Sequence, residues 1–101
     1  MSIIFISGPM TGKPNFNRDE FNTTAARLWA IGHTVLNPAI LPDGLTWDHY
    51  MDISLAMLRG ADAIYLLDGW EESEGARREF NVARRLRLEI STPESRKGGG
   101  S

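Results

Sequence analysis

Glu79 carries the clearest chemical signal in the chain, because a helical pattern places its carboxylate among apolar side chains. Residues 69–79 read Gly-Trp-Glu-Glu-Ser-Glu-Gly-Ala-Arg-Arg-Glu, and a helix opening here turns by about 100° per residue. The face that holds Glu79 also holds Ala76, Phe80, Val82, Ala83 and Leu86. A carboxylate directed toward a packed interior is costly unless it is paired or protonated, which makes Glu79 a candidate for function. A buried Glu satisfied by an Arg or by backbone amides is the structural alternative.

A loop rich in Gly and Pro is the second candidate for chemistry. It comprises Gly8, Pro9, Met10, Thr11, Gly12, Lys13 and Pro14. It is not a P-loop, because three residues instead of four separate its glycines and Pro follows the Lys. Its glycines nevertheless allow close approach of the backbone, so Thr11, Lys13 and a nearby helix N-terminus can hold a phosphate or a sugar hydroxyl. The alternative is an ordinary turn with Lys13 in solvent.

The start of the Glu79 helix offers a possible anion site. Ser73 is placed to cap this helix, and Gly75 leaves the first amides uncovered. Trp70 precedes them in a loop, where its ring could stack on a base or cover the core. Trp29 and Trp47, in contrast, follow the phase of their helices and are expected in the core.

The order of predicted elements indicates an α/β fold with a small doubly wound parallel sheet. Strands are predicted at residues 2–7, 33–36, 61–67 and 87–90, with helices at 17–31, at 47–59 and around Glu79. Asn17 is expected to cap the first helix, with Phe16 packing against Phe21. Such alternation predicts a parallel sheet with helices on both faces. We expect about four strands in the order 2-1-3-4. We expect one domain over 1–91 and a flexible tail, a linker or expression remnant, over 92–101.

Ligands of such sheets bind beyond the carboxyl ends of the strands, where the strand order reverses. The loops at residues 7–16 and 68–73 both emerge at this edge, so Ser7 and Asp68 join the candidate site. Ser54 adds a hydroxyl in the middle of the apolar stripe of the helix at 47–59. The loops at residues 7–16 and 68–73 and the helices that carry Ser54 and Glu79 are therefore expected to meet at one crevice.

Composition narrows the classes of function. The 101 residues carry a formal net charge of −2, which argues against a surface for a nucleic-acid polymer. There is no Cys, and neither His33 nor His49 has a second ligand at metal spacing, so neither a metal nor a cofactor is expected. No apolar run approaches the roughly 20 residues of a membrane span, and the start lacks a basic region before its short apolar run. We therefore expect a cytoplasmic protein without a membrane partner.

Three segments carry a resemblance to a known family. Residues 5–12, 62–65 and 69–79 resemble the DUF4406 proteins of phages and bacteria, which are similar to nucleoside 2-deoxyribosyltransferases and 2'-deoxynucleoside 5'-monophosphate N-glycosidases. The resemblance covers roughly residues 2–90. It implies that Glu79 attacks the sugar C1' and forms a glycosyl-enzyme intermediate, which water or a new base resolves. It also implies that Ser73 contacts a phosphate.

The chain departs from those enzymes at two positions. Phe5 stands where the enzymes have a Tyr that orients the catalytic Glu, and Ser54 stands where they have an Asp. The family's fifth strand, whose end supplies a residue to the neighbouring subunit, also lacks a counterpart. The resemblance therefore implies a homodimer or a higher homo-oligomer.

These observations define one candidate site and two main functions. Glu79 is the expected nucleophile, and the expected substrate-binding residues are Phe5, Ser7, Gly8, Pro9, Met10, Thr11, Gly12, Lys13, Ser54, Asp68, Trp70, Ser73 and Gly75. We expect an N-glycosidase or a deoxyribosyltransferase-like enzyme that acts on a small nucleoside or nucleotide. The alternative is a non-catalytic protein that binds a nucleotide or a nucleotide-derived signal in the same crevice. A small oligomeric structural domain is a third possibility.

Overall fold

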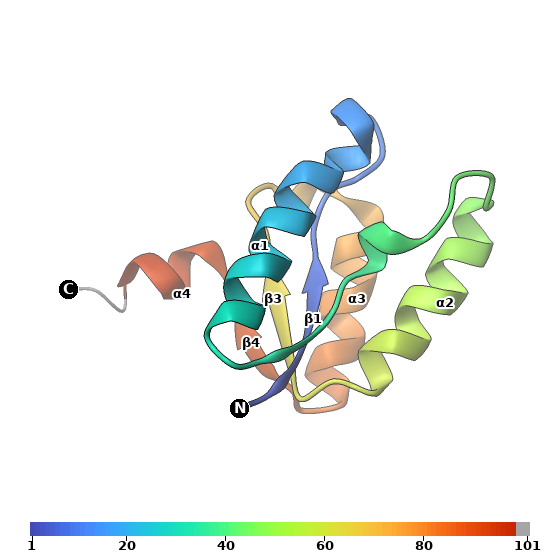
Figure 1. Ribbon diagram of the computed structural model, residues 1–101. Coiled ribbons are helices and arrows are strands. Elements are labelled where there is room, and N and C mark those ends of the chain that lie inside the picture. Colours follow the sequence, from blue (N-terminus) through green and yellow to red (C-terminus); the bar gives the residue numbers. More distant parts are fainter. Residues whose placement is uncertain (99–101) are drawn as a thin grey trace.

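A four-stranded parallel sheet forms the centre of the molecule. The computed structural model describes residues 1–98. The strands are β1 (Ile3–Ser7), β2 (Thr34–Leu36), β3 (Ala63–Leu66) and β4 (Glu89–Ser91), and they lie in the order β2-β1-β3-β4 (Figure 1). β1 is paired on both sides, with Ile4 opposite Val35 of β2 and opposite Ala63 of β3. The predicted fold class and strand order are confirmed.

Helices cover both faces of this sheet. α1 (Arg18–Ala30) lies on one face, whereas α2 (Trp47–Arg59) and α3 (Glu74–Arg85) pack on the other (Figure 1). Short 3-10 turns precede these helices at Pro14–Asn17 (η1), Pro38–Ile40 (η2) and Trp70–Glu72 (η3), and α4 (Pro93–Gly98) follows the last strand. No helix within residues 1–98 has the length and apolar character needed to cross a membrane.

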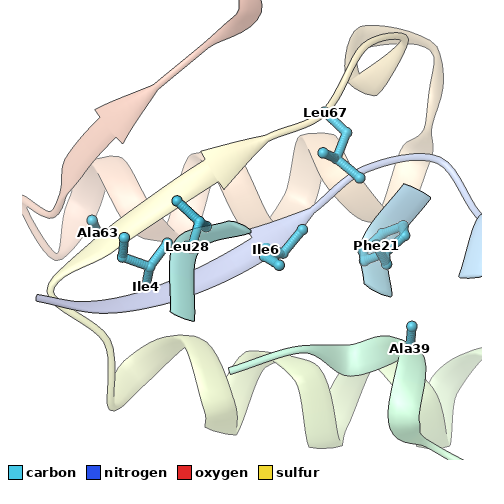
Figure 2. Packing of buried hydrophobic residues seen from close by; sticks show 7 residues of the cluster. All are labelled: Ile4, Ile6, Phe21, Leu28, Ala39, Ala63 and Leu67. Atoms are coloured by element: carbon cyan, nitrogen blue, oxygen red, sulfur yellow. The ribbon is translucent and has the colours of Figure 1, made fainter. Parts of the chain in front are cut away.

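The alternation of side chains along β1 divides the core into two layers. Ile4 and Ile6 point toward Leu28 and Phe21 of α1 (Figure 2). Phe5 points to the other face, where it joins Leu58 of α2 and a cluster that also contains Ala61, Ile64, Leu66 and Ala83. Because side chains alternate along a strand, Ser7 shares the face of Phe5 and lies at the end nearest to the loops. β1 thus directs one hydroxyl toward the α2 and α3 layer.

The predicted helix starts are partly correct. Ser73 caps α3 as expected, because its Oγ accepts a hydrogen bond from the amide of Ala76 at 3.2 Å. Asn17 does not cap α1. It has a φ of 62°, and its side-chain amide donates to the carbonyl of Pro9 at 3.0 Å. The loop after β1 uses this side chain to hold its own backbone.

The predicted positions of two Trp side chains are wrong. The buried side chains of α1 are Phe21, Thr24 and Leu28, and Trp29 follows Leu28 by about 100° of helical turn, which leaves it 68% exposed. Trp47 begins α2, before the stripe of Met51, Ser54 and Leu58, and is 39% exposed. Phe16, expected to pack against Phe21, is also exposed.

The chain after β4 is more ordered than expected over the described residues. Instead of a flexible tail from residue 92, Pro93–Gly98 forms α4, and Pro93 is buried. The guanidinium of Arg96 donates to the carbonyl of Leu66 at 2.6 Å and stacks over the ring of Tyr65 at 3.8 Å. These contacts fix α4 against β3. The expected flexibility of residues 99–101 lies outside the described residues.

Candidate active site

A cavity lies beyond the carboxyl ends of β1 and β3, at the predicted edge of the sheet. Its volume is about 860 Å³, within the range usual for small-molecule sites. The loop after β1, η1 and the connection at residues 38–46 form one part of its lining. The segment around η3 and the N-terminal halves of α2 and α3 form the rest, and Glu79 belongs to this part. The strand order changes direction at this point, because β1 connects to an edge strand on one side and β3 follows on the other.

Glu79 is buried in the wall of this cavity, as its helical phase predicts. Its side chain is 3% exposed, and its Oε1 accepts a hydrogen bond from the hydroxyl of Ser7 at 2.6 Å. Its Oε2 has no hydrogen-bond partner among residues 1–98. The structural alternative, a Glu satisfied by an Arg or by backbone amides, is therefore not found within residues 1–98, and Oε2 is buried without a partner there.

The surroundings of Glu79 make it a weaker acid than usual. Burial raises the pKa of Glu79 to about 7, and the hydroxyls of Ser7 and Ser54 lower it in part. Ser54 is fully buried on α2, and its own hydroxyl donates to the carbonyl of Met51 at 3.3 Å. At neutral pH the carboxyl group is thus divided between its protonated and ionised forms, which is the range useful for acid, base or nucleophilic chemistry.

The loop after β1 lies against Leu67, and Gly8 is required for this packing. A Cβ at Gly8 would stand 2.8 Å from the Cβ of Leu67. Pro9, Met10, Thr11 and Lys13 line the cavity together with Gly8. Gly12 has a φ of +82°, which only Gly adopts easily, and it shapes the turn outside the lining.

The start of α3 forms another wall. Ser73 and Gly75 line the cavity, and a Cβ at Gly75 would lie 3.3 Å from the Sδ of Met51. The close contact between α2 and α3 therefore depends on Gly75. Glu72 and Glu74 line the same wall, so an anion bound at the helix amides would lie near two carboxylates.

Six of the expected substrate-binding residues lie outside the lining, namely Phe5, Ser7, Gly12, Ser54, Asp68 and Trp70. Trp70 packs against Phe80, with ring centroids 4.8 Å apart, and joins the core cluster between the sheet and α3. Of the two roles that the sequence left open for Trp70, this packing fits the one in which its ring covers the core. Asp68 is exposed, and Phe5 is fully buried beneath the site. The structure thus places Trp70 and Phe5 as packing residues.

The cavity also contains residues that the sequence analysis missed. The hydroxyl of Tyr50 on α2 donates to Sδ of Met10 at 2.8 Å. Arg18 of α1 donates to Oδ1 of Asp43 at 2.6 Å and stacks over the ring of Phe16 at 5.2 Å, so it links two loops of the lining. One signal could have revealed Tyr50, since it lies one helical turn before Ser54 and shares its face.

Fold and cavity define this molecule as a doubly wound α/β protein with a titratable carboxylate in a ligand-sized site. The family model described as "Domain of unknown function (DUF4406)" matches residues 2–92, and the chain belongs to that family. Among solved structures, it is similar to a 2-desoxiribosyltransferase from Leishmania mexicana, with a TM-score of 0.72 and 21% sequence identity. The match covers 91% of this chain and 63% of that chain. At this identity the likeness establishes the fold. A comparison with curated proteins found no match.

Proposed function

We propose that this protein cleaves the C1' glycosidic bond of a small nucleoside or nucleotide, with Glu79 as the nucleophile. The observation that carries this proposal is the state of the Glu79 carboxyl group. Ser7 holds one of its oxygens, and the other has no partner among the described residues while the group lines a cavity of about 860 Å³. A carboxylate held in this way is oriented for attack on a carbon that develops positive charge.

The proposed reaction has two steps. The ionised Glu79 attacks C1' through Oε2 as the bond from C1' to the base breaks, and a glycosyl-enzyme intermediate forms. Water then releases the sugar, or a second base accepts it, which corresponds to an N-glycosidase or a deoxyribosyltransferase-like enzyme. The pKa of Glu79, at about 7, means that the nucleophilic form increases as the pH rises through neutrality. The similarity in fold to a 2-desoxiribosyltransferase supports this class of reaction.

The lining suits the two ends of a nucleoside differently. Phe16, Leu45 and Trp47 offer apolar surface for a base, whereas Thr11, Lys13 and Ser73 offer polar groups for a sugar or a phosphate. The charges are not all favourable to phosphate. Two cationic side chains line the cavity, against the carboxylates of Asp43, Glu72, Glu74 and Glu79. Nucleosides and their monophosphates are therefore both candidate substrates.

The test is release of free base from a panel of 2-deoxynucleosides and their 5'-monophosphates. Glu79→Gln keeps the shape of the side chain and removes the nucleophile, so base release should fall to background. Glu71→Gln is the matched control, because Glu71 is exposed and lies outside the cavity lining. Full activity in the Glu79→Gln variant would exclude the mechanism.

The same panel separates the alternative functions. Binding of a nucleotide without turnover by the wild-type chain would favour the non-catalytic binding protein. Position 5 keeps this alternative open, because Phe stands there where the enzymes that the chain resembles have a Tyr. Phe5 is fully buried and offers no hydroxyl to Glu79. No binding of any member of the panel would favour a structural domain.

We also propose that a second copy of the chain completes the site. The cavity remains open to solvent, and the resemblance implies a neighbouring subunit that supplies a residue to the site. Light scattering coupled to gel filtration gives the molar mass in solution. A monomer that retains full activity would contradict a shared site.

A further inference from the structure

Tyr50 stands in the same cavity as Glu79 and has a hydroxyl with a weak partner. It reaches from α2 to the loop after β1, where its hydroxyl donates to the thioether Sδ of Met10 at 2.8 Å. A thioether is a poor acceptor compared with an oxygen or a ring nitrogen. A ligand that places such an atom near Met10 would therefore take over this hydrogen bond at small cost.

Arg18, a second donor in this lining, is already engaged. The guanidinium of Arg18 is engaged by Asp43 at 2.6 Å and stacked over Phe16. Phe5, which lies below Ser7 on the same face of β1, has no hydroxyl. Trp47 and Phe16 bring aromatic surface to the lining that contains Tyr50, so the surroundings suit a flat heterocycle. Tyr50 thus offers a weakly engaged donor beside aromatic surface of the cavity.

The charge around Tyr50 keeps its hydroxyl protonated. Burial raises the pKa of Tyr50 above its ordinary value, the negative charge of Glu79 raises it further, and Arg18 lowers it in part. A phenol with a raised pKa remains a hydrogen-bond donor throughout the neutral range. It serves as a donor of a hydrogen bond and not as a source of a free proton.

We propose that Tyr50 is a catalytic residue that donates a hydrogen bond to the departing base. This inference rests on the proposed glycosidic cleavage. As Oε2 of Glu79 forms its bond to C1', the bond from C1' to the base nitrogen breaks and its electron pair leaves with the base. The base then carries negative charge, spread over its ring nitrogens and exocyclic oxygens. A donor at one of these atoms stabilises that charge as it develops.

The step balances with water as the only further reactant. Water supplies the proton that neutralises the departed base, and the remaining hydroxide equivalent hydrolyses the bond between Glu79 and C1'. The products are free base, free sugar and the regenerated carboxylate. Tyr50 begins and ends the cycle protonated, and its hydrogen bond returns to Met10 when the base leaves.

Tyr50→Phe tests this role with two substrates that differ in their need for a donor. A 2-deoxynucleoside releases a strongly basic leaving group, whereas 4-nitrophenyl 2-deoxyriboside releases a stable phenolate. We expect kcat for base release to fall on the order of 100-fold in the variant, because one donor to a developing charge is lost. Release of 4-nitrophenolate should fall by less than about threefold, since that leaving group needs no such donor.

Tyr65→Phe is the matched control, because Tyr65 is the other Tyr of the chain and packs against Arg96 away from the cavity. It should leave both reactions unchanged. Far-UV circular dichroism and thermal unfolding verify that each variant is folded. If Tyr50→Phe fails to fold, Tyr50→Met fills the position without a hydroxyl and should show the same selective loss on the nucleoside.

Three outcomes overturn the inference. Equal losses on both substrates would show that Tyr50 only maintains the shape of the cavity. No loss on the nucleoside would show that the base is stabilised elsewhere, while the proposed function would stand. Wild-type protein that cleaves neither substrate would remove the proposed function itself, and this inference with it.

Discussion

At the scale of single residues, the burial of Glu79 links function to stability. A carboxyl group with no ion pair in the described chain is held at 3% exposure, and its pKa is raised from 4.5 to about 7. The folded protein therefore binds this proton more tightly than the unfolded chain does. By linkage, the stabilising contribution is complete below pH 4.5 and is lost as the pH rises through 7.

Glu79→Gln should therefore change the pH dependence of stability. One pKa unit corresponds to about 1.4 kcal/mol, so ionisation of Glu79 costs the wild-type fold roughly 3 kcal/mol above pH 7. The variant does not titrate and should be more stable than wild type at pH 8, by roughly 1 to 3 kcal/mol, with the difference shrinking at pH 5. Urea unfolding of both proteins at the two pH values measures this.

The control for this measurement is Glu71→Gln, which removes an exposed carboxylate of the same charge. It should follow the wild-type stability at both pH values. A Glu79→Gln variant whose stability differs from wild type by the same amount at pH 5 and pH 8 would contradict a raised pKa in the folded state.

At the scale of elements, β1 joins the core to the chemistry. Its alternation directs Phe5 and Ser7 to the same face, so that a packing side chain lies directly below the hydroxyl that holds Glu79. α2 contributes Ser54 and Tyr50 one turn apart, and the start of α3 contributes Ser73 and Gly75. β1, α2 and α3 therefore each supply side chains to the site and to the same core cluster, which contains Phe5, Leu58 and Ala83.

Phe5→Tyr tests whether β1 limits catalysis. A phenol at this position would stand below Ser7 and could fix the Glu79 carboxylate in its ionised form, so glycosidase activity should rise. The added hydroxyl enters a fully buried position, which costs about 1 to 3 kcal/mol of stability if it finds no partner. Base release is compared with that of wild type at matched concentrations of folded protein.

A folded Phe5→Tyr variant that binds ligand and shows no gain would count against this role of β1. It would leave Ser54, where the enzymes that the chain resembles carry an Asp, as the departure that limits the rate. It would also strengthen the reading of the chain as a binding protein.

At the scale of the whole molecule, the loops of the cavity concentrate charges of both signs. Lys13 lies on the loop after β1, Arg18 bridges to Asp43, and Glu72 and Glu74 stand at the start of α3. Whether the site accepts a phosphate depends on the sum of these charges, since a helix N-terminus alone contributes little beside two carboxylates.

Lys13→Ala should weaken binding of a 5'-monophosphate more than binding of the corresponding nucleoside. A charge-assisted hydrogen bond contributes on the order of 1.5 to 3 kcal/mol, or roughly 10- to 100-fold in Kd. Titration calorimetry with the two ligands measures the difference, and Lys97→Ala on α4 serves as the control. Equal losses for both ligands would show that Lys13 does not recognise the phosphate.

Much of this protein follows from local patterns in its sequence. The alternation of apolar strands with helices predicts the parallel sheet with helices on both faces, because parallel strands require crossovers and these have a fixed hand. The same kind of pattern predicts the burial of Glu79, since residue phase within a helix is set by its geometry alone. Ser73 is recognised as a cap for the same local reason.

Only the tertiary structure decides which side chains meet. The contact between Tyr50 and Met10 joins residues 40 positions apart, and the contact between Ser7 and Glu79 joins residues 72 apart. Trp70 packs against Phe80 of α3 and lies outside the cavity lining. Pro93–Gly98 docks through Arg96, which donates to the carbonyl of Leu66 in β3. In both cases another element of the fold supplies the packing surface. Local patterns carry no information about such surfaces. The sequence therefore determines that a carboxylate is buried, and the fold determines that Ser7 holds it, that Tyr50 lines the same cavity and that Oε2 has no partner among residues 1–98.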